Sequence, residues 1–129
     1  MILLDTHIWM WWVEKSPRLT SKQQGYLREY EEEGLAISIY SFWEIAKLVE
    51  YQRIIFKSDL ENWFDNAVAH PKLQVIELTL PIIIESTRLI NFHKDPADQI
   101  IVATAKILNI PLLTADEKIL NYAGVKLLK

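Results

Sequence analysis

Four acidic residues stand where short apolar runs end or where helical patterns begin: Asp5, Glu44, Asp98 and Asp116. Carboxylates gathered without a cation repel one another and raise each other's pKa, so a cluster of this kind is expected to bind a hard divalent ion. Oxygen ligands favour Mg²⁺ or Mn²⁺ over zinc. An ion held in this way activates water and neutralises a phosphate oxygen, which is the chemistry of phosphodiester hydrolysis.

Each of these acids also has an explanation that requires no ligand. Asp5 and Asp116 each follow an apolar run and could cap a helix. Glu44 follows Ser41 with the spacing of an S-x-x-E capping box. Asp98 lies in the first turn of an expected helix, where an acid favours the helix dipole. Capping does not require the acids to follow successive strands, however, so their joint placement favours a common site.

The sequence predicts an α/β fold around a mostly parallel central sheet of four to five strands, with helices on both faces. Apolar runs predict strands at residues 2–4, 35–38, 73–77, 110–113 and, more weakly, 125–128. Helical periodicity predicts helices at residues 8–13, 21–33, 41–51, 58–70, 81–92, 96–108 and 117–122. Because the carboxyl ends of parallel strands meet at one edge of a sheet, the four acids are expected to converge there.

The composition indicates one folded domain that spans residues 1–129, with 50% hydrophobic residues and a net charge of -3. This charge argues against a large basic surface for nucleic acid, but a few local cations could still hold a substrate. The chain has no cysteine, which excludes disulfides, thiol nucleophiles and cysteine-bound zinc and favours a reducing compartment. We expect a cytoplasmic protein, because there is no basic leader and no apolar run near the roughly 20 residues of a membrane span.

Four motifs carry the acids in a fixed order along the chain. They are Leu-Leu-Asp-Thr-His-Ile-Trp at residues 3–9, Ser-x-x-Glu at 41–44, Asp-x-x-Ile followed by Ala at 98–105, and Leu-x-Thr-x-Asp at 112–116. In type and order these motifs resemble those of the PIN-domain nucleases, and within that family the VapC-type toxins of toxin–antitoxin pairs. The resemblance covers nearly the whole chain and implies a PIN-like α/β/α architecture.

The resemblance assigns roles to the same acids. It implies that Asp5, Glu44, Asp98 and Asp116 are the catalytic, metal-binding residues. It implies that three hydroxyls support them, those of Thr6, Ser41 and Thr114. It further implies an Mg²⁺- or Mn²⁺-dependent endoribonuclease in which a metal-activated water is the nucleophile. The implied partners are an RNA substrate, a cognate antitoxin and a second copy of the chain in a homodimer.

The sequence departs from the resemblance beside the third acid. Related sequences often carry a basic residue there, whereas this chain has Gln99. Lys47, Arg53 and Lys94 are the candidate RNA contacts in its place, although an exposed lysine or arginine needs no ligand. Lys47 follows Glu44 by three residues and so shares its expected helix face.

Two other classes of protein compete with this interpretation. Aspartyl-phosphate phosphatases and receivers also place acids at strand ends, but the phosphatases need an Asp where His7 stands, and receivers need an acidic pair and a late lysine at a strand end. The other alternative is a catalytically inactive PIN-like interaction module whose acids are only caps. Its partner would contact the five tryptophans, which we expect to serve core packing or an interface rather than base stacking.

The three histidines lack the spacing of metal ligands.

Overall fold

The computed structural model describes residues 1–129 and contains one four-stranded parallel sheet in the order β3-β2-β1-β4. The strands are β1 (Ile2–Leu4), β2 (Leu35–Ser38), β3 (Leu73–Ile76) and β4 (Leu112–Leu113). The central strand β1 pairs in parallel with β2 on one side and with β4 on the other. The predicted parallel α/β sheet is therefore confirmed, and the carboxyl ends of all four strands point to the same edge.

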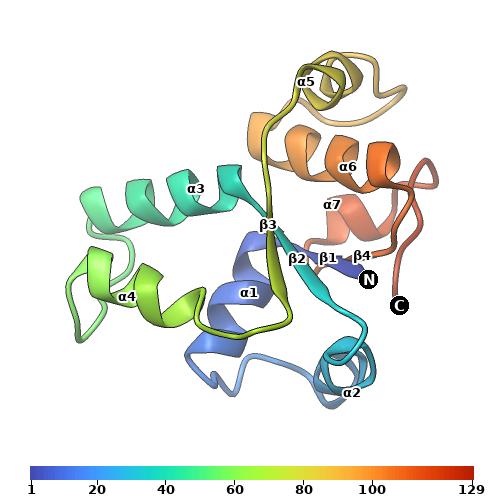
Figure 1. Ribbon diagram of the computed structural model, residues 1–129. Coiled ribbons are helices and arrows are strands. Elements are labelled where there is room, and N and C mark those ends of the chain that lie inside the picture. Colours follow the sequence, from blue (N-terminus) through green and yellow to red (C-terminus); the bar gives the residue numbers. More distant parts are fainter.

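Helices cover both faces of this sheet, as the sequence predicted (Figure 1). The seven helices are α1 (Thr6–Val13), α2 (Ser21–Tyr30), α3 (Ile39–Glu50), α4 (Leu60–Ala67), α5 (Leu80–Ser86), α6 (Pro96–Leu108) and α7 (Glu117–Leu120). Helices α1 to α4 lie over one face, whereas α6 and α7 lie over the other and α5 packs on α6. The sheet edge that carries the acids is thus enclosed by helix starts.

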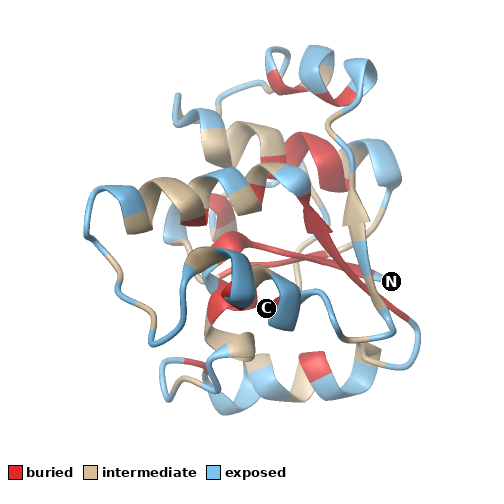
Figure 2. Cartoon of the chain, turned by 60° about the vertical axis from the view of Figure 1, so that its left-hand side comes forward, coloured by how far each residue is buried: buried red, intermediate tan, exposed pale blue.

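The alternation of side chains along β1 and β2 creates two separate cores. Ile2 and Leu4 point to the face covered by α1 to α4, whereas Leu3 points to the face covered by α6 and α7. All three are fully buried, and the two central strands are the most buried part of the chain (Figure 2). A strand buried on both faces needs apolar residues at every position, which explains the uninterrupted run before Asp5.

The predicted fifth strand at residues 125–128 is wrong. The segment makes only an isolated parallel bridge between Leu127 and Leu112. Two hydrogen bonds hold it, one from Leu112 N to Lys126 O at 2.9 Å and one from Leu128 N to Leu112 O at 3.1 Å. Because β4 is only two residues long, it offers too short an edge for a further strand.

The start of α3 differs from the prediction in a way that matters for Glu44. The helix begins at Ile39, and Ser38 is its N-cap, with its side chain accepting from Tyr40 N at 3.1 Å. The predicted helix start at Ser41 is therefore wrong by two residues: Ser41 lies inside the first turn and is buried, so it does not form a capping box with Glu44. Glu44 therefore has no part in a capping box, which was the best explanation of this residue that required no ligand.

Helix α5 is shorter than the predicted helix at residues 81–92, because it ends at Ser86 with Thr87 as its C-cap. Asn91 adopts the left-handed conformation with φ 59°, which an α-helix does not allow. Leu89 and Phe92 instead pack against the core beneath α6.

No helix in the structure combines the length and the apolar character needed to cross a lipid bilayer.

Candidate metal centre

All four predicted acids line one cavity at the carboxyl edge of the sheet, with a volume of about 290 Å³. Asp5 joins β1 to α1, Glu44 projects from α3, Asp98 from the first turn of α6, and Asp116 precedes α7. The full lining consists of Asp5, His7, Trp11, Glu44, Asp95, Asp98, Ala115 and Asp116. The parallel sheet thus brings together four carboxylates that lie far apart in the sequence.

Asp5 is the most buried of the four acids and uses both of its carboxylate oxygens. Oδ1 accepts from Thr6 N at 2.7 Å, which makes Asp5 the N-cap of α1. Oδ2 accepts from the Thr114 hydroxyl at 2.5 Å. Burial raises the pKa of Asp5, and the hydrogen bonds from Thr114 and Thr6 oppose that rise. The predicted capping role and a place in the acidic cavity are therefore compatible in this residue.

Glu44 is held by the hydroxyl of Thr6, which donates to Glu44 Oε1 at 2.6 Å. Thr6 Oγ1 also lies 2.7 Å from Ser41 Oγ, and since a hydroxyl carries one proton, Ser41 can supply the proton of that second bond. Burial raises the pKa of Glu44, the Thr6 hydrogen bond lowers it, and the charge of Asp5 raises it. Ser41 is therefore linked to Glu44 only indirectly, through the hydroxyl of Thr6.

Thr114 connects Asp5 to Asp116. Its hydroxyl donates to Asp5 and accepts from Asp116 N at 3.0 Å. Asp116 caps α7, because its Oδ1 accepts from Lys118 N at 2.8 Å and from Ile119 N at 3.3 Å. One buried hydroxyl thus positions two acids that follow neighbouring strands, Asp5 after β1 and Asp116 after β4.

Asp98 shows most clearly that the cavity concentrates negative charge. Its side chain is 14% exposed and lies beyond the N-cap Asp95, whose Oδ1 accepts from Ala97 N at 3.0 Å. Burial, together with the smaller effects of the charges of Asp5, Asp95, Asp116 and Glu44, raises the pKa of Asp98 to about 7. Near neutral pH this group is therefore poised to exchange its proton for a cation.

His93 also lies at this site, although no sequence pattern predicted it there. One ring nitrogen of His93 and one carboxylate oxygen each from Asp98 and Asp116 lie within 4.8 Å of one another. His93 Nε2 is 3.1 Å from Asp98 Oδ2, yet the orientation does not form a hydrogen bond, so this buried nitrogen has no donor or acceptor partner. The histidine lies in the loop before α6, at a spacing that matches no metal-ligand motif.

The predicted RNA contacts lie outside the acidic cavity. Lys47 forms an ion pair with Glu50 at 3.3 Å and lies over the rings of Trp43 and Tyr51, at 5.5 and 5.6 Å from their centroids. Arg53 and Lys94 are exposed, and neither lines the acidic cavity. Lys47 is therefore occupied within its own helix, whereas Arg53 and Lys94 remain available to a ligand.

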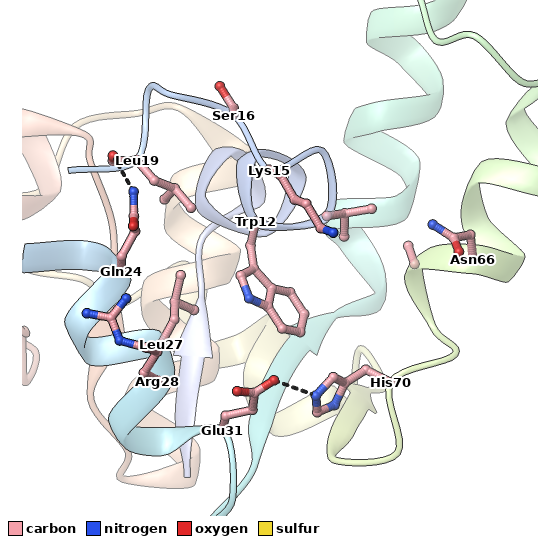
Figure 3. A pocket seen from close by; sticks show the side chains of 12 residues that line it. Trp12, Lys15, Ser16, Leu19, Gln24, Leu27, Arg28, Glu31, Asn66 and His70 are labelled. Atoms are coloured by element: carbon pink, nitrogen blue, oxygen red, sulfur yellow. Dashed lines mark hydrogen bonds and ion pairs between the residues drawn. The ribbon is translucent and has the colours of Figure 1, made fainter. Parts of the chain in front are cut away.

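A second cavity, of about 500 Å³, lies between α1, α2 and the end of α4 (Figure 3). Trp12 points into it, and its ring lies 5.3 Å from that of His70. The one acid in its wall, Glu31, accepts from or pairs with His70 Nε2 at 2.8 Å. This cavity therefore lacks the group of carboxylates that marks the sheet edge.

A parallel sheet with carboxylates and a histidine gathered at its carboxyl edge defines an α/β domain with an acidic site in the crevice where such folds bind ligands. The chain belongs to the PIN domain family, because the sequence profile of the PIN domain matches residues 2–125. The family indicated by the four motifs is thus confirmed.

Similar proteins agree with this assignment. Ribonuclease VapC22 from Mycobacterium tuberculosis is 28% identical over 122 residues, which cover 94% of this chain and 91% of that protein. VapBC2 from Rickettsia felis, bound to a DNA fragment from its promoter, superposes with a TM-score of 0.70 at 18% identity and covers 98% of this chain and 97% of that one. A toxin–antitoxin complex from Klebsiella pneumoniae gives a TM-score of 0.68 at 20% identity, covering 100% and 97%. These structures share the fold of this chain.

Proposed function

We propose that this chain is a single PIN domain that acts as an Mg²⁺- or Mn²⁺-dependent endoribonuclease and is the toxin of a toxin–antitoxin pair. The observation that carries the proposal is the convergence of Asp5, Glu44, Asp98 and Asp116 in one cavity at the sheet edge. The names of similar proteins support the choice of substrate and partner, since one is a ribonuclease and another is a toxin–antitoxin complex. A cysteine-free chain of this kind suits the reducing cytoplasm.

The donor set fits a hard divalent cation. The cavity offers carboxylate oxygens from four acids, and beside them His93 Nε2 is a buried nitrogen without a hydrogen-bond partner. Burial and, to a smaller extent, the neighbouring carboxylates raise the pKa of Asp98 to about 7, and a bound cation would offset both effects by stabilising the ionised form. A bound Mg²⁺ or Mn²⁺ would supply Lewis acidity toward a phosphate oxygen and toward water.

The remaining residues of the site position the acids. Thr6 directs Glu44 into the cavity by donating to Oε1, and the buried Ser41 beside it completes the hydroxyl pair. Thr114 holds Asp5 Oδ2 and orients Asp116 through its backbone N–H. Carboxylates fixed by such bonds keep their orientation without a ligand, which lowers the cost of binding.

The contacts with partners outside the acidic cavity stay predictions. Arg53 and Lys94 are exposed and available to RNA, and Lys47 would have to leave Glu50 to reach it. For the homodimer, helix α5 exposes Leu80, Ile83 and Ile84, which would lose water on association with a second copy.

The decisive experiment uses the purified, antitoxin-free protein. It is incubated with cellular RNA in Mg²⁺, in Mn²⁺ and in EDTA, and cleavage is expected only with metal. Asp5→Ala and Asp98→Ala should each abolish cleavage. Asp65→Ala, which removes an exposed acid of α4, is the matched control and should cleave like the wild type.

Two results would contradict the proposal. Metal-independent cleavage would show that the four acids do not act through a cation. The absence of any metal-dependent cleavage that Asp5→Ala or Asp98→Ala removes would favour an inactive PIN-like interaction module, in which these residues serve only as caps and as charge at a binding surface.

A further inference from the structure

A third cavity, of about 580 Å³, adjoins the acidic cavity, and the two share Trp11 in their walls. It lies between α1, the start of α4 and the loop at residues 51–59. We propose that it binds the nucleotides next to the scissile phosphate of a single-stranded RNA, with a base stacked on Trp11. This inference rests on the proposed function, because it places the reacting phosphate at the acidic cavity.

Trp11 lines both cavities, so an RNA strand that occupied the two would run past its side chain. It projects from α1, is partly exposed and lines both cavities, so part of its side chain can be reached from each of them. Its ring lies 5.8 Å from that of His7, which also lines the acidic cavity. Aromatic side chains that bind single strands use such open faces, since every base can stack on them whatever its sequence.

The far side of the third cavity is also aromatic. Phe56 and Trp63 stack almost in parallel, with ring centroids 4.5 Å apart and an interplanar angle of 8°. Beside them Ile55 is 89% exposed, which is unusual for an isoleucine in a loop next to a cavity. A base that entered here would cover apolar surface that is otherwise in contact with water.

The charges of this cavity match a phosphate backbone. Arg18 and Lys57 line it and are exposed, and neither lies within ion-pair distance of a carboxylate. The acid in its wall, Glu14, accepts a hydrogen bond from Trp63 Nε1 at 2.8 Å. Two free cations beside an aromatic surface, continuous with an acidic site for phosphate chemistry, favour RNA over a protein segment as the occupant.

The test measures RNA binding and cleavage on the same set of variants. Binding of a fluorescent pool of random single-stranded RNA, about 12 nucleotides long, is followed by anisotropy in EDTA at several salt concentrations. Trp11→Leu removes the aromatic face but keeps apolar bulk, and it should raise Kd about tenfold without changing the dependence on salt. Arg18→Ala and Lys57→Ala should each lower the slope of log affinity against log salt by about 0.7.

Trp12→Leu is the matched control, because Trp12 is the neighbouring tryptophan on α1 but lines the cavity of Figure 3. It should bind and cleave RNA like the wild type. Trp11→Phe keeps an aromatic face and should restore most of the affinity that Trp11→Leu loses. Thermal unfolding of each variant separates lost binding from lost folding, and the two surface variants at Arg18 and Lys57 leave the core untouched.

The outcomes distinguish this inference from the proposed function. If the wild type cleaves RNA but Trp11→Leu, Arg18→Ala and Lys57→Ala all keep its Kd and salt slope, the cavity does not bind RNA and the inference is wrong. If the wild type binds RNA through this cavity but shows no metal-dependent cleavage, the proposed function fails and RNA binding stands.

Discussion

The hydroxyl of Thr6 donates to Glu44 Oε1 at 2.6 Å, although the two residues are 38 positions apart in the chain. Thr6 opens α1 directly after β1, and Glu44 projects from α3 directly after β2. Because β1 and β2 are neighbouring parallel strands, the helices that follow them start side by side. This hydrogen bond therefore connects Thr6, at the start of the helix after β1, to Glu44, in the helix after β2.

We predict that Thr6→Val lowers metal-dependent RNA cleavage by about 10- to 100-fold, which is typical when a group that orients a metal ligand is lost. Valine has the shape of threonine but no hydroxyl, so Glu44 would lose its donor inside a partly buried site. The control is Thr104→Val, because Thr104 is also buried but donates to Ile100 O within α6. Equal activity in both variants would contradict the role of Thr6.

Asp98→Asn should stabilise the metal-free protein at about pH 8. The pKa of Asp98 is raised to about 7 by burial and by the neighbouring carboxylates, so its ionised form is unfavourable in the folded state. Asparagine keeps the size and removes the charge, and the free energy of unfolding should rise by roughly 1 to 3 kcal/mol in EDTA. Urea unfolding measures the change. No gain at pH 8, or an equal gain at pH 5, would show that the ionised form of Asp98 does not destabilise the metal-free protein.

The stability of the metal-free wild type should fall as the pH rises from about 4 to about 7. Asp98 binds its proton more tightly in the folded state than its usual pKa of 3.8 allows in the unfolded chain, so the folded state holds more protons between these values. Burial raises the pKa of Asp5 and of Glu44 in the same direction. Urea unfolding in EDTA across this range tests the sign, and a stability that rises with pH would contradict it.

Added Mn²⁺ should reverse this trend. A cation competes with the protons on Asp98 and its neighbours, so its stabilising effect should be larger at pH 8 than at pH 5. The measurement is the midpoint of thermal unfolding with and without Mn²⁺ at both pH values. Asp98→Asn should respond less to the metal, and a response equal to that of the wild type would exclude Asp98 from the ion site.

His93→Gln should weaken Mn²⁺ binding more than Mg²⁺ binding. His93 offers a nitrogen close to the oxygens of Asp98 and Asp116, and a nitrogen ligand should matter more to the transition-metal ion Mn²⁺ than to Mg²⁺, a hard cation that takes oxygen ligands. We expect Kd for Mn²⁺ to rise about tenfold, as titration calorimetry would show. Equal effects on the two metals would indicate that His93 only orients Asp98, and no effect on either would place it outside the ion site.

Local patterns accounted for much of the site's framework. Asp5 and Asp116 were expected as possible helix caps, and both cap helices in the structure. Asp98 was expected in the first turn of its helix and stands there. These features depend on the residue itself and on neighbours within about four positions, because capping bonds and helix dipoles act over the first turn.

The capping-box explanation of Glu44 did not hold, because it depends on which nearby residue starts the helix. The Ser-x-x-Glu spacing is present, but Ser38 lies at the end of β2 and starts the helix first, so Ser41 falls inside α3. The five tryptophans likewise look alike in the sequence. In the structure Trp9 and Trp63 are core residues, Trp43 is 53% exposed, and Trp11 and Trp12 line different cavities.

The sequence by itself determined the parallel α/β fold, the four acids and their family, because buried strands and helix starts leave local signals and the acids lie at those signals. Only the tertiary structure decided which groups face the acids: Thr6 beside Glu44, Thr114 beside Asp5, and His93 beside Asp98. Such pairs depend on the order of strands in the sheet and on how helices pack over it. No short segment of the sequence determines the strand order or the helix packing, because both depend on burying the two cores at the same time.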